Sequence, residues 1–302
     1  MRWGDMRESQ NVEDRTGEGG GGGGFPLGGG MRLGGGALIL AVIASLILGI
    51  NPLEMLGLLA GGGGSIQQAP PQSAPPGYGP QTAPPAPTAP TAEKTRSSKV
   101  LGDTEEVWGA LFKAMGNRYE PPKLVLFSRK INSACGTASA AVGPFYCSED
   151  RKLYLDTAFF DELASRFGAP GDFAQAYVIA HEVGHHVQNL FGTMRQFDAQ
   201  TQRMDDRGRN AMSVRLELQA DCYAGVWGYF AQKRNLLDPG DLEAGMRAAA
   251  AVGDDQIQKR TQGYVVPEGF THGSAQQRQR WFKAGLDSGD PRNCNTFDAR
   301  QL

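Results

Sequence analysis

The stretch "FAQAYVIAHEVGHHVQNLF" (173–191) predicts the central helix of this protein. Pro170, Gly171 and Asp172 precede it and favour a helix start, and Gly192 follows it and favours a helix end. Three of the chain's four histidines lie inside this stretch. The cluster is therefore either a chemical site or a polar patch on a helix.

The spacing of two of these histidines favours a metal site. His181 and His185 stand four residues apart, so both imidazoles project from one helix face, about one turn apart. Two nitrogens at this spacing can share one Zn²⁺ at about 2.1 Å each. Glu182 is turned about 100° around the helix, so it can act on a water at the metal as a general base. His186 points off this face, and we expect it in a hydrogen-bonding or surface role.

A catalytic zinc needs a third protein ligand and one open position. The segment "RLELQADCYAG" (215–225) offers Glu217 as that ligand. Asp221, four residues later, is expected to accept the ring N–H of His181 and so to orient it. His272 is the alternative third ligand, which would give a three-histidine site. The further histidine that metzincins carry after this motif is absent from the residues that follow, "HVQNLFG".

Together the motifs resemble the gluzincin arrangement of thermolysin and of membrane-bound zinc peptidases. More closely, the chain resembles the bacterial neutral zinc metallopeptidase family, and this resemblance covers nearly everything outside the low-complexity stretches. It implies a zinc peptidase with ligands His181, His185 and Glu217 and the base Glu182. The segments that carry it are "MRW…NVEDR" (1–15), "ACG…GPFYC" (134–147), "HEVGHHVQ" (181–188), "RLELQADCYAGVW" (215–227) and "THGSAQQRQRWF" (271–282).

Water attack on a peptide carbonyl builds an oxyanion that needs a hydrogen-bond donor besides the metal. His272, which lies between Thr271 and the expected cap of the last helix, is the candidate donor. A capping or core histidine is the alternative for this residue. Tyr264 and Tyr177 are further candidates, because a phenol can donate in the same way.

The four cysteines are not arranged as C-x-x-C, which argues against a second metal site. An even number in a domain outside the cytoplasm predicts two disulfides, for which three pairings are possible. We favour Cys135–Cys147, which closes a short loop, and this leaves Cys222–Cys294. Free buried thiols are the alternative.

Residues 33–50, "LGGGALILAVIASLILGI", carry no charge. Eighteen helical residues reach roughly 27 Å, close to a hydrocarbon core of about 30 Å, so a single transmembrane anchor is expected over 32–60. A cleaved signal peptide and a buried soluble helix are the alternatives. Four arginines precede the segment and no Lys or Arg follows it before Lys94. This bias places the N-terminus in the cytoplasm and the domain on the periplasmic or extracellular side of the inner membrane.

The amino-acid composition differs between the first third of the chain and the remainder, and this difference indicates the domain boundaries. The 42 glycines and 18 prolines of the 302 residues crowd into the first third. We expect a disordered cytoplasmic tail over 1–31, a Pro/Gly-rich linker over 61–93, and one domain over 94–302. The net charge of −2 and the absence of basic runs interleaved with aromatic residues give no reason to expect nucleic acid as a partner.

The domain is expected to be mainly helical with a small sheet, an α+β zincin-like fold. "KLVLF" (123–127) and "KLYLD" (152–156) predict strands. Helices are expected over 173–191, 196–234 and 241–260, and a last one from Ser274, where Gln277 would complete a capping box.

The sequence thus predicts a membrane-anchored zinc peptidase that acts on proteins or peptides. The alternative is a zinc-stabilised binding module outside the cytoplasm with little or no proteolytic activity. Such a module has no need for Glu182, and its zinc would have four protein ligands.

Overall fold

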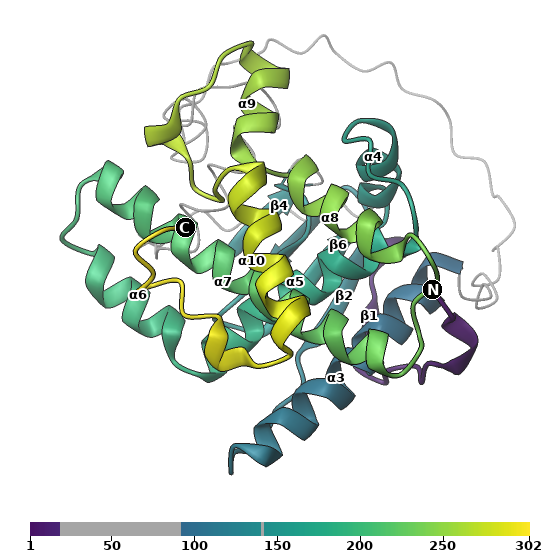
Figure 1. Ribbon diagram of the computed structural model, residues 1–302. Coiled ribbons are helices and arrows are strands. Elements are labelled where there is room, and N and C mark those ends of the chain that lie inside the picture. The colour runs from purple at the N-terminus through teal and green to yellow at the C-terminus, as the bar shows by residue number, and fades with distance from the viewer. Residues whose placement is uncertain (19–91, 140–141) are drawn as a thin grey trace, which may run out of the picture.

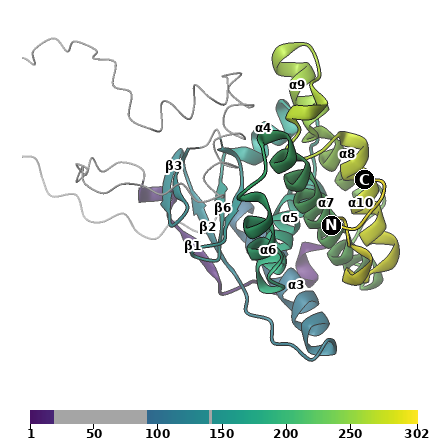
Figure 2. The ribbon, with the colours of Figure 1, turned by 90° about the vertical axis from the view of Figure 1, so that its left-hand side faces the viewer.

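The computed structural model of the chain describes residues 1–18, 92–139 and 142–302. Within these ranges the protein is mainly helical, with a small sheet against one side of the central helices, so the expected α+β class is confirmed (Figures 1 and 2). The expected anchor over 32–60 lies outside the described residues, as does all but the end of the linker. Among the helices that are described, none is long and apolar enough to cross a membrane.

Four strands form the sheet in the order β1–β2–β6–β5. The two predicted strands are its centre: β2 (Lys123–Phe127) and β6 (Lys152–Asp156) pair in parallel. β5 (Phe145–Cys147) joins β6 in the antiparallel direction. A separate hairpin, β3 (Lys130–Ser133) with β4 (Gly136–Ser139), follows β2 in the chain.

Alternate residues of the central strands enter two separate cores, because successive side chains point to opposite faces of a sheet. Leu124 and Leu126 join the large core formed with the helices. Val125 and Phe127 join a smaller core that includes Ile131 of the β3–β4 hairpin. Both faces of the sheet are therefore covered, and β2 is buried over four of its five residues.

The fourth strand comes from the N-terminus. β1 (Val12–Asp14) pairs in parallel with β2, with Val12 opposite Leu124. Met6 is buried in the large core, and the backbone N–H of Arg2 donates to the carbonyl of Leu236 at 2.9 Å. Two short turns of 3-10 helix, η1 (Trp3–Asp5) and η2 (Thr16–Glu18), flank the strand.

The expectation of a disordered tail over 1–31 is therefore wrong for its first 18 residues. Their polar composition provides little apolar surface of their own, which is why they resemble a disordered segment. Their order comes instead from contacts with residues about 100 positions later, such as the bonds from Ser9 and Asn11 to Glu105.

The central helix, α5 (Asp172–Leu190), is confirmed almost to the residue. The helical region expected over 196–234 is two helices, α6 (Thr193–Thr201) and α7 (Asp206–Lys233), because Asp205 starts a new helix by accepting a bond from the N–H of Gly208. The region expected over 241–260 is also two helices, α8 (Asp241–Ala251) and α9 (Asp254–Gln262). They are separated at Gly253, whose backbone is extended.

The last helix, α10 (Ala275–Ser288), begins at Ser274 with both halves of the predicted capping box present. The remaining elements are α3 (Ala92–Ala114), α4 (Phe159–Ser165), η4 (Pro267–Gly269) and η5 (Pro291–Asn293). α7 packs against α5 on one side and α10 on the other, which places segments from three parts of the sequence side by side (Figure 1).

Two disulfides are present, in the favoured pairing. Cys135–Cys147 joins the turn of the β3–β4 hairpin to β5. Cys222–Cys294 joins the middle of α7 to the segment that follows η5. The second bridge therefore ties the C-terminal segment to the helix that carries Glu217.

Candidate metal centre

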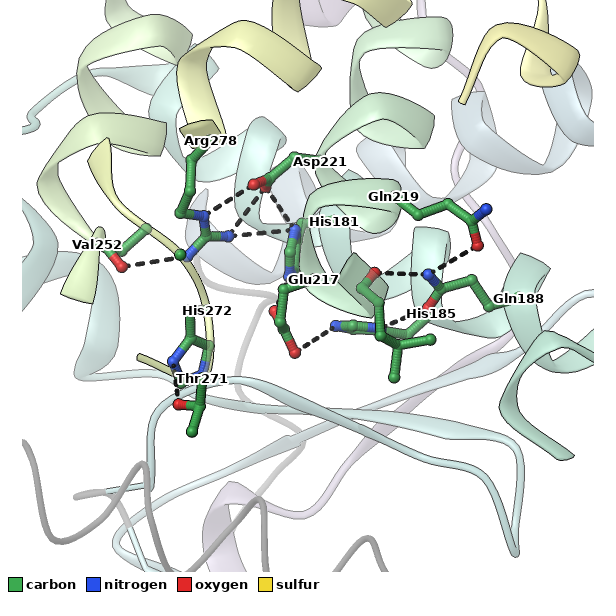
Figure 3. A network of polar contacts seen from close by, with 12 residues as sticks. His181, His185, Gln188, Glu217, Gln219, Asp221, Val252, Thr271, His272 and Arg278 are labelled. Atoms are coloured by element: carbon green, nitrogen blue, oxygen red, sulfur yellow. Dashed lines mark hydrogen bonds and ion pairs between the residues drawn. The ribbon is translucent and has the colours of Figure 1, made fainter. Parts of the chain in front are cut away.

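The structure brings His181, His185 and Glu217 together. The two histidines lie on adjacent turns of α5, Glu217 faces them from α7, and all three side chains are buried. Nε2 of His181 lies 3.2 Å from Oε2 of Glu217, and Nε2 of His185 lies 3.5 Å from Oε1 (Figure 3). His272 is not a member of this group, so the fold places Glu217, and not His272, in the position of the third ligand.

This donor set fits zinc. Two imidazole nitrogens and one carboxylate oxygen leave a fourth position open in a tetrahedral site. Two ligand atoms that each lie about 2.1 Å from a tetrahedral ion are about 3.4 Å apart. The nitrogen–oxygen separations of 3.2 and 3.5 Å, which run from the two rings to different oxygens of Glu217, are close to that value. One ligand atom from each of the three residues lies within 4.8 Å of the others. Burial opposes the charged form of Glu217, but the two histidines outweigh it and hold the pKa of the carboxyl well below its usual range.

Asp221 orients His181, as expected. Its Oδ1 lies 2.8 Å from Nδ1 of His181, so Nδ1 donates there and the lone pair of Nε2 is left for a metal. Asp221 has no exposed surface and also accepts a 2.5 Å hydrogen bond from the hydroxyl of Tyr177. Burial works against protonation of His181, but Asp221 and Glu217 outweigh it and raise its pKa to about 9.

A different group orients His185. Its Nδ1 lies 2.9 Å from Oε1 of Gln188, one turn later on α5. The Gln188 amide nitrogen donates to the carbonyl of Leu216 at 2.6 Å and to Oε1 of Gln219 at 3.1 Å. Because the amide nitrogen is committed to these two acceptors, the amide oxygen must face His185, whose Nδ1 donates to it.

Glu182 is buried beside the ligands. Burial raises the pKa of its carboxyl, and the neighbouring His185 and His181 offset part of that effect. A carboxyl group with a raised pKa, next to a metal position, has the properties of a general base.

His186 has the structural role expected of it. Its Nε2 lies 2.6 Å from the carbonyl oxygen of Glu120, and its Nδ1 lies 3.0 Å from the hydroxyl of Tyr146. Burial lowers its pKa to about 4, so the ring is neutral. It ties α5 to β5 and to the loop before β2.

The family described as "Putative neutral zinc metallopeptidase" matches residues 1–297. This chain belongs to that family. It is 45% identical over 297 residues to YpfJ of Escherichia coli K12, with 98% of this chain and 99% of YpfJ covered. It is also 46% identical over 204 residues to Mb2605 of Mycobacterium bovis and to Rv2575 of Mycobacterium tuberculosis, covering 64% of this chain and 68% of each relative. All three relatives are described as uncharacterized, and no solved structure matches the chain.

Zinc is the metal implied by membership of this family, and His181, His185 and Glu217 are the residues in the described part of the chain that would hold it. A peptidase family also implies a protein or peptide substrate. These conclusions agree with the sequence-based expectations for the cofactor and the substrate class.

His272 lies beside this group rather than in it (Figure 3). Its Nδ1 is 3.0 Å from Oδ1 of Asp254, a carboxylate without exposed surface. The other oxygen of Asp254 accepts bonds from the backbone N–H groups of Thr271, His272 and Gly273. Burial works against a charged His272, but Asp254 outweighs it, so the pKa of the imidazole is raised. The cap of α10 is Ser274, so capping is not the role of this histidine.

The two tyrosines proposed as alternative donors occupy different positions. The hydroxyl of Tyr177 is committed to Asp221, so this candidate is wrong as an oxyanion donor. Tyr264 is 62% exposed, on the loop that follows α9.

Sequence reasoning missed three polar residues that surround the ligands. Gln188 could have been found, because it stands three residues after His185 on the same helix. Gln219 and Arg278 carried no comparable signal, because only the packing of α7 and α10 brings them to Gln188 and Asp221, the partners of the two histidines (Figure 3).

Proposed function

We propose that this protein is a zinc-dependent peptidase that hydrolyses peptide bonds by water attack, with Glu182 as the general base. The observation that supports it best is the convergence of His181, His185 and Glu217 in a buried site, where one ligand atom from each residue lies within 4.8 Å of the others. A zinc ion bound there would polarise the scissile carbonyl and acidify water.

The protein's own residues would carry the proton transfers. Glu182 accepts a proton from the attacking water and passes it to the departing amine. Its raised pKa, caused first by burial, favours a base that can return the proton. His272, held by Asp254, donates a hydrogen bond to the oxyanion as charge develops there. Asp254 favours the positively charged form of the His272 ring, which is a stronger hydrogen-bond donor than the neutral ring.

The substitution Glu182→Gln tests this mechanism. It removes the base without removing a ligand, so zinc content should stay at the parent value while hydrolysis of a mixed peptide library is lost. Glu243→Gln, the same chemical change on an exposed residue of α8, is the matched control and should cleave normally. Normal turnover by Glu182→Gln would rule out this mechanism. A zinc-loaded parent that cleaves nothing in the library would favour the binding-module alternative.

We further propose that the peptidase is associated with the membrane and acts outside the cytoplasm. The uncharged residues 33–50 have the length that a bilayer requires. The two disulfides support an oxidising compartment. Fractionation of cells that produce the full chain, or a variant without residues 33–50, tests the association. The full chain should sediment with membranes and the variant should not; membrane retention of the variant would contradict the proposal.

A further inference from the structure

Arg278 of α10 is a fully charged side chain in the interior, with 4% of its surface exposed. Its Nε and Nη2 donate to the two carboxylate oxygens of Asp221 at 2.8 and 2.9 Å, in a two-pronged arrangement (Figure 3). Its Nη1 donates to the carbonyl of Val252 at the end of α8, at 3.1 Å. These bonds hold the guanidinium in one orientation, in which two of its N–H groups face the two oxygens of Asp221.

Arg278 and the candidate metal ligand His181 both bind the carboxylate of Asp221. The same oxygen, Oδ1, accepts from Arg278, from the Tyr177 hydroxyl and from Nδ1 of His181. Nη2 of Arg278 also lies 3.2 Å from the Tyr177 oxygen and 3.4 Å from Nδ1 of His181. A displacement of this carboxylate would therefore change the orientation of His181.

An isolated carboxylate in this position would be unstable, because Asp221 has no contact with solvent. Without the two hydrogen bonds from Arg278, the carboxylate would be free to turn toward other donors. Such a turn removes the acceptor that directs Nδ1 of His181, and with it the direction of the Nε2 lone pair. Tyr177 is a neutral donor and cannot supply the missing charge.

Close contact between two helices places Arg278 at this carboxylate. A Cβ atom on Gly285 of α10 would lie 2.0 Å from the carbonyl oxygen of Cys222, and one on Gly225 of α7 would lie 2.1 Å from that of Phe282. Only glycine permits backbones to approach so closely. Arg278 precedes Gly285 by seven residues, about two helical turns, and so lies on the same face of α10, toward α7.

We propose that Arg278 is a positioning residue of the zinc centre. It fixes the Asp221 carboxylate as the acceptor of the His181 ring N–H, and thereby aims the metal-binding nitrogen of His181 at the ion. This inference rests on the proposed zinc site. It assigns to Arg278 no contact with substrate.

The test compares Arg278→Lys and Arg278→Gln with the matched control Arg280→Lys. Arg280 lies two residues further along α10, is exposed, and binds the C-terminal carbonyl of Leu302 instead. Zinc affinity of the full chain is measured by competition with a chelator. Loss of a group that orients a ligand typically weakens metal binding about 10- to 100-fold, and we expect this for both Arg278 variants and no change for the control. The visible spectrum of bound Co²⁺ should shift in the Arg278 variants alone.

Arg278→Lys separates geometry from charge, because it keeps the positive charge and loses the planar fork. It also keeps the test valid if Arg278→Gln does not fold. Zinc affinity within twofold of the parent, with an unchanged Co²⁺ spectrum, would overturn the role of Arg278. A parent chain that binds no zinc would instead overturn the proposed function, and this inference with it.

Residues 1–18 belong to the same folded body as the metal centre. β1 is hydrogen-bonded to β2, and Glu13 forms ion pairs with Lys123 and Lys152 at 3.0 and 3.1 Å. The indole N–H of Trp3 donates to Asp172, the first residue of the helix that carries the histidine ligands, at 2.7 Å.

Paired strands lie about 4.8 Å apart, whereas the hydrocarbon core of a bilayer is about 30 Å thick, so two paired strands cannot lie on opposite faces of a membrane. We infer that residues 1–18 and 92–302 lie on the same face of the membrane, although the apolar residues 33–50 stand between them in the sequence. The N-terminus and the metal centre then share one compartment. This differs from the orientation expected from the arginines, which separates the two.

Single cysteines test this topology in cells that produce the full chain. Gln10→Cys and Lys113→Cys replace exposed residues, one on each side of the apolar stretch, and the four native cysteines are paired as disulfides. A maleimide that does not cross membranes is added to intact cells and, separately, to lysed cells, with the parent chain as the blank. Labelling of both variants in intact cells is expected, because the domain is proposed to lie outside the cytoplasm. Labelling of both only after lysis would overturn that location. Labelling of only one of them in intact cells would overturn the shared compartment.

Discussion

Gly184 of α5 lies directly against Ala220 of α7: a Cβ atom on Gly184 would be 2.8 Å from the carbonyl oxygen of Ala220. Gly184 stands between the two histidine ligands in the sequence, and Ala220 stands between Glu217 and Asp221. The contact therefore sets the separation of the two helices at the level of the metal ligands.

Gly184→Ala should push the helices apart, because the obstructing atom belongs to backbone and cannot rotate away. We expect a loss of about 1–3 kcal/mol in the free energy of unfolding, together with weaker zinc binding. Gly109→Ala in α3 is the control, since nothing lies within 4 Å of a Cβ atom there. That variant should be neutral or more stable by about 0.5–1 kcal/mol. Denaturant unfolding and chelator competition measure both effects, and unchanged stability in Gly184→Ala would mean that the helices separate at no cost.

His272→Ala should lower kcat by about 100- to 1000-fold, the usual effect of removing an oxyanion donor. Zinc content should not change, because His272 lies outside the group of ligands. Asp254→Asn should have a smaller effect in the same direction, since it removes the carboxylate that holds the ring. Zinc loss in His272→Ala would instead return this histidine to the ligand set.

Zinc binding should weaken in acid. Burial works against protonation of His181, but Asp221 and Glu217 raise its pKa to about 9, so below that pH the metal must displace a proton from the ring. The apparent affinity should therefore fall by about tenfold for each pH unit below 9, and it should level off above 9. Chelator competition at several pH values measures the slope. Asp221→Asn removes a carboxylate that raises this pKa, so the affinity should level off at a lower pH than in the parent; levelling off at an unchanged pH in that variant would contradict the assignment.

The disulfide Cys222–Cys294 should contribute more stability than Cys135–Cys147. The two bridges span sequence separations of 72 and 12 residues. A chain-entropy estimate gives about 4 and about 3 kcal/mol, respectively. Replacing each pair by serines and measuring unfolding in denaturant tests the order.

The longer bridge should also affect the metal site. The side-chain amide of Gln219 donates to the carbonyl of Cys294 at 3.0 Å, and Gln219 in turn holds Gln188, the partner of His185. Zinc affinity should consequently fall in the Cys222/Cys294 double variant and remain at the parent value in the Cys135/Cys147 variant. Equal zinc affinity in both variants would show that Gln219 keeps its position without the bridge.

Local sequence was sufficient for much of the site. Four-residue spacing on one helix is enough to place His181 and His185 together, because the geometry of a helix turn is independent of the rest of the fold. The same reasoning places Glu217 and Asp221 on one face of α7. The capping box at Ser274 and the alternating strands at 123–127 and 152–156 are local patterns as well, and each was confirmed.

Contacts between distant segments decided the rest. Only the approach of Gly184 to Ala220 brings the carboxylate of α7 to the histidines of α5, and only the crossing of α10 over α7 takes Arg278 to Asp221. β1 has no pattern of its own that distinguishes it from a disordered tail; its order depends on pairing with a strand more than 100 residues away. The sequence by itself determined which side chains could share a metal, because helix periodicity is local. The tertiary structure decided which charges and which strand surround that metal, because those depend on how the helices and the sheet pack.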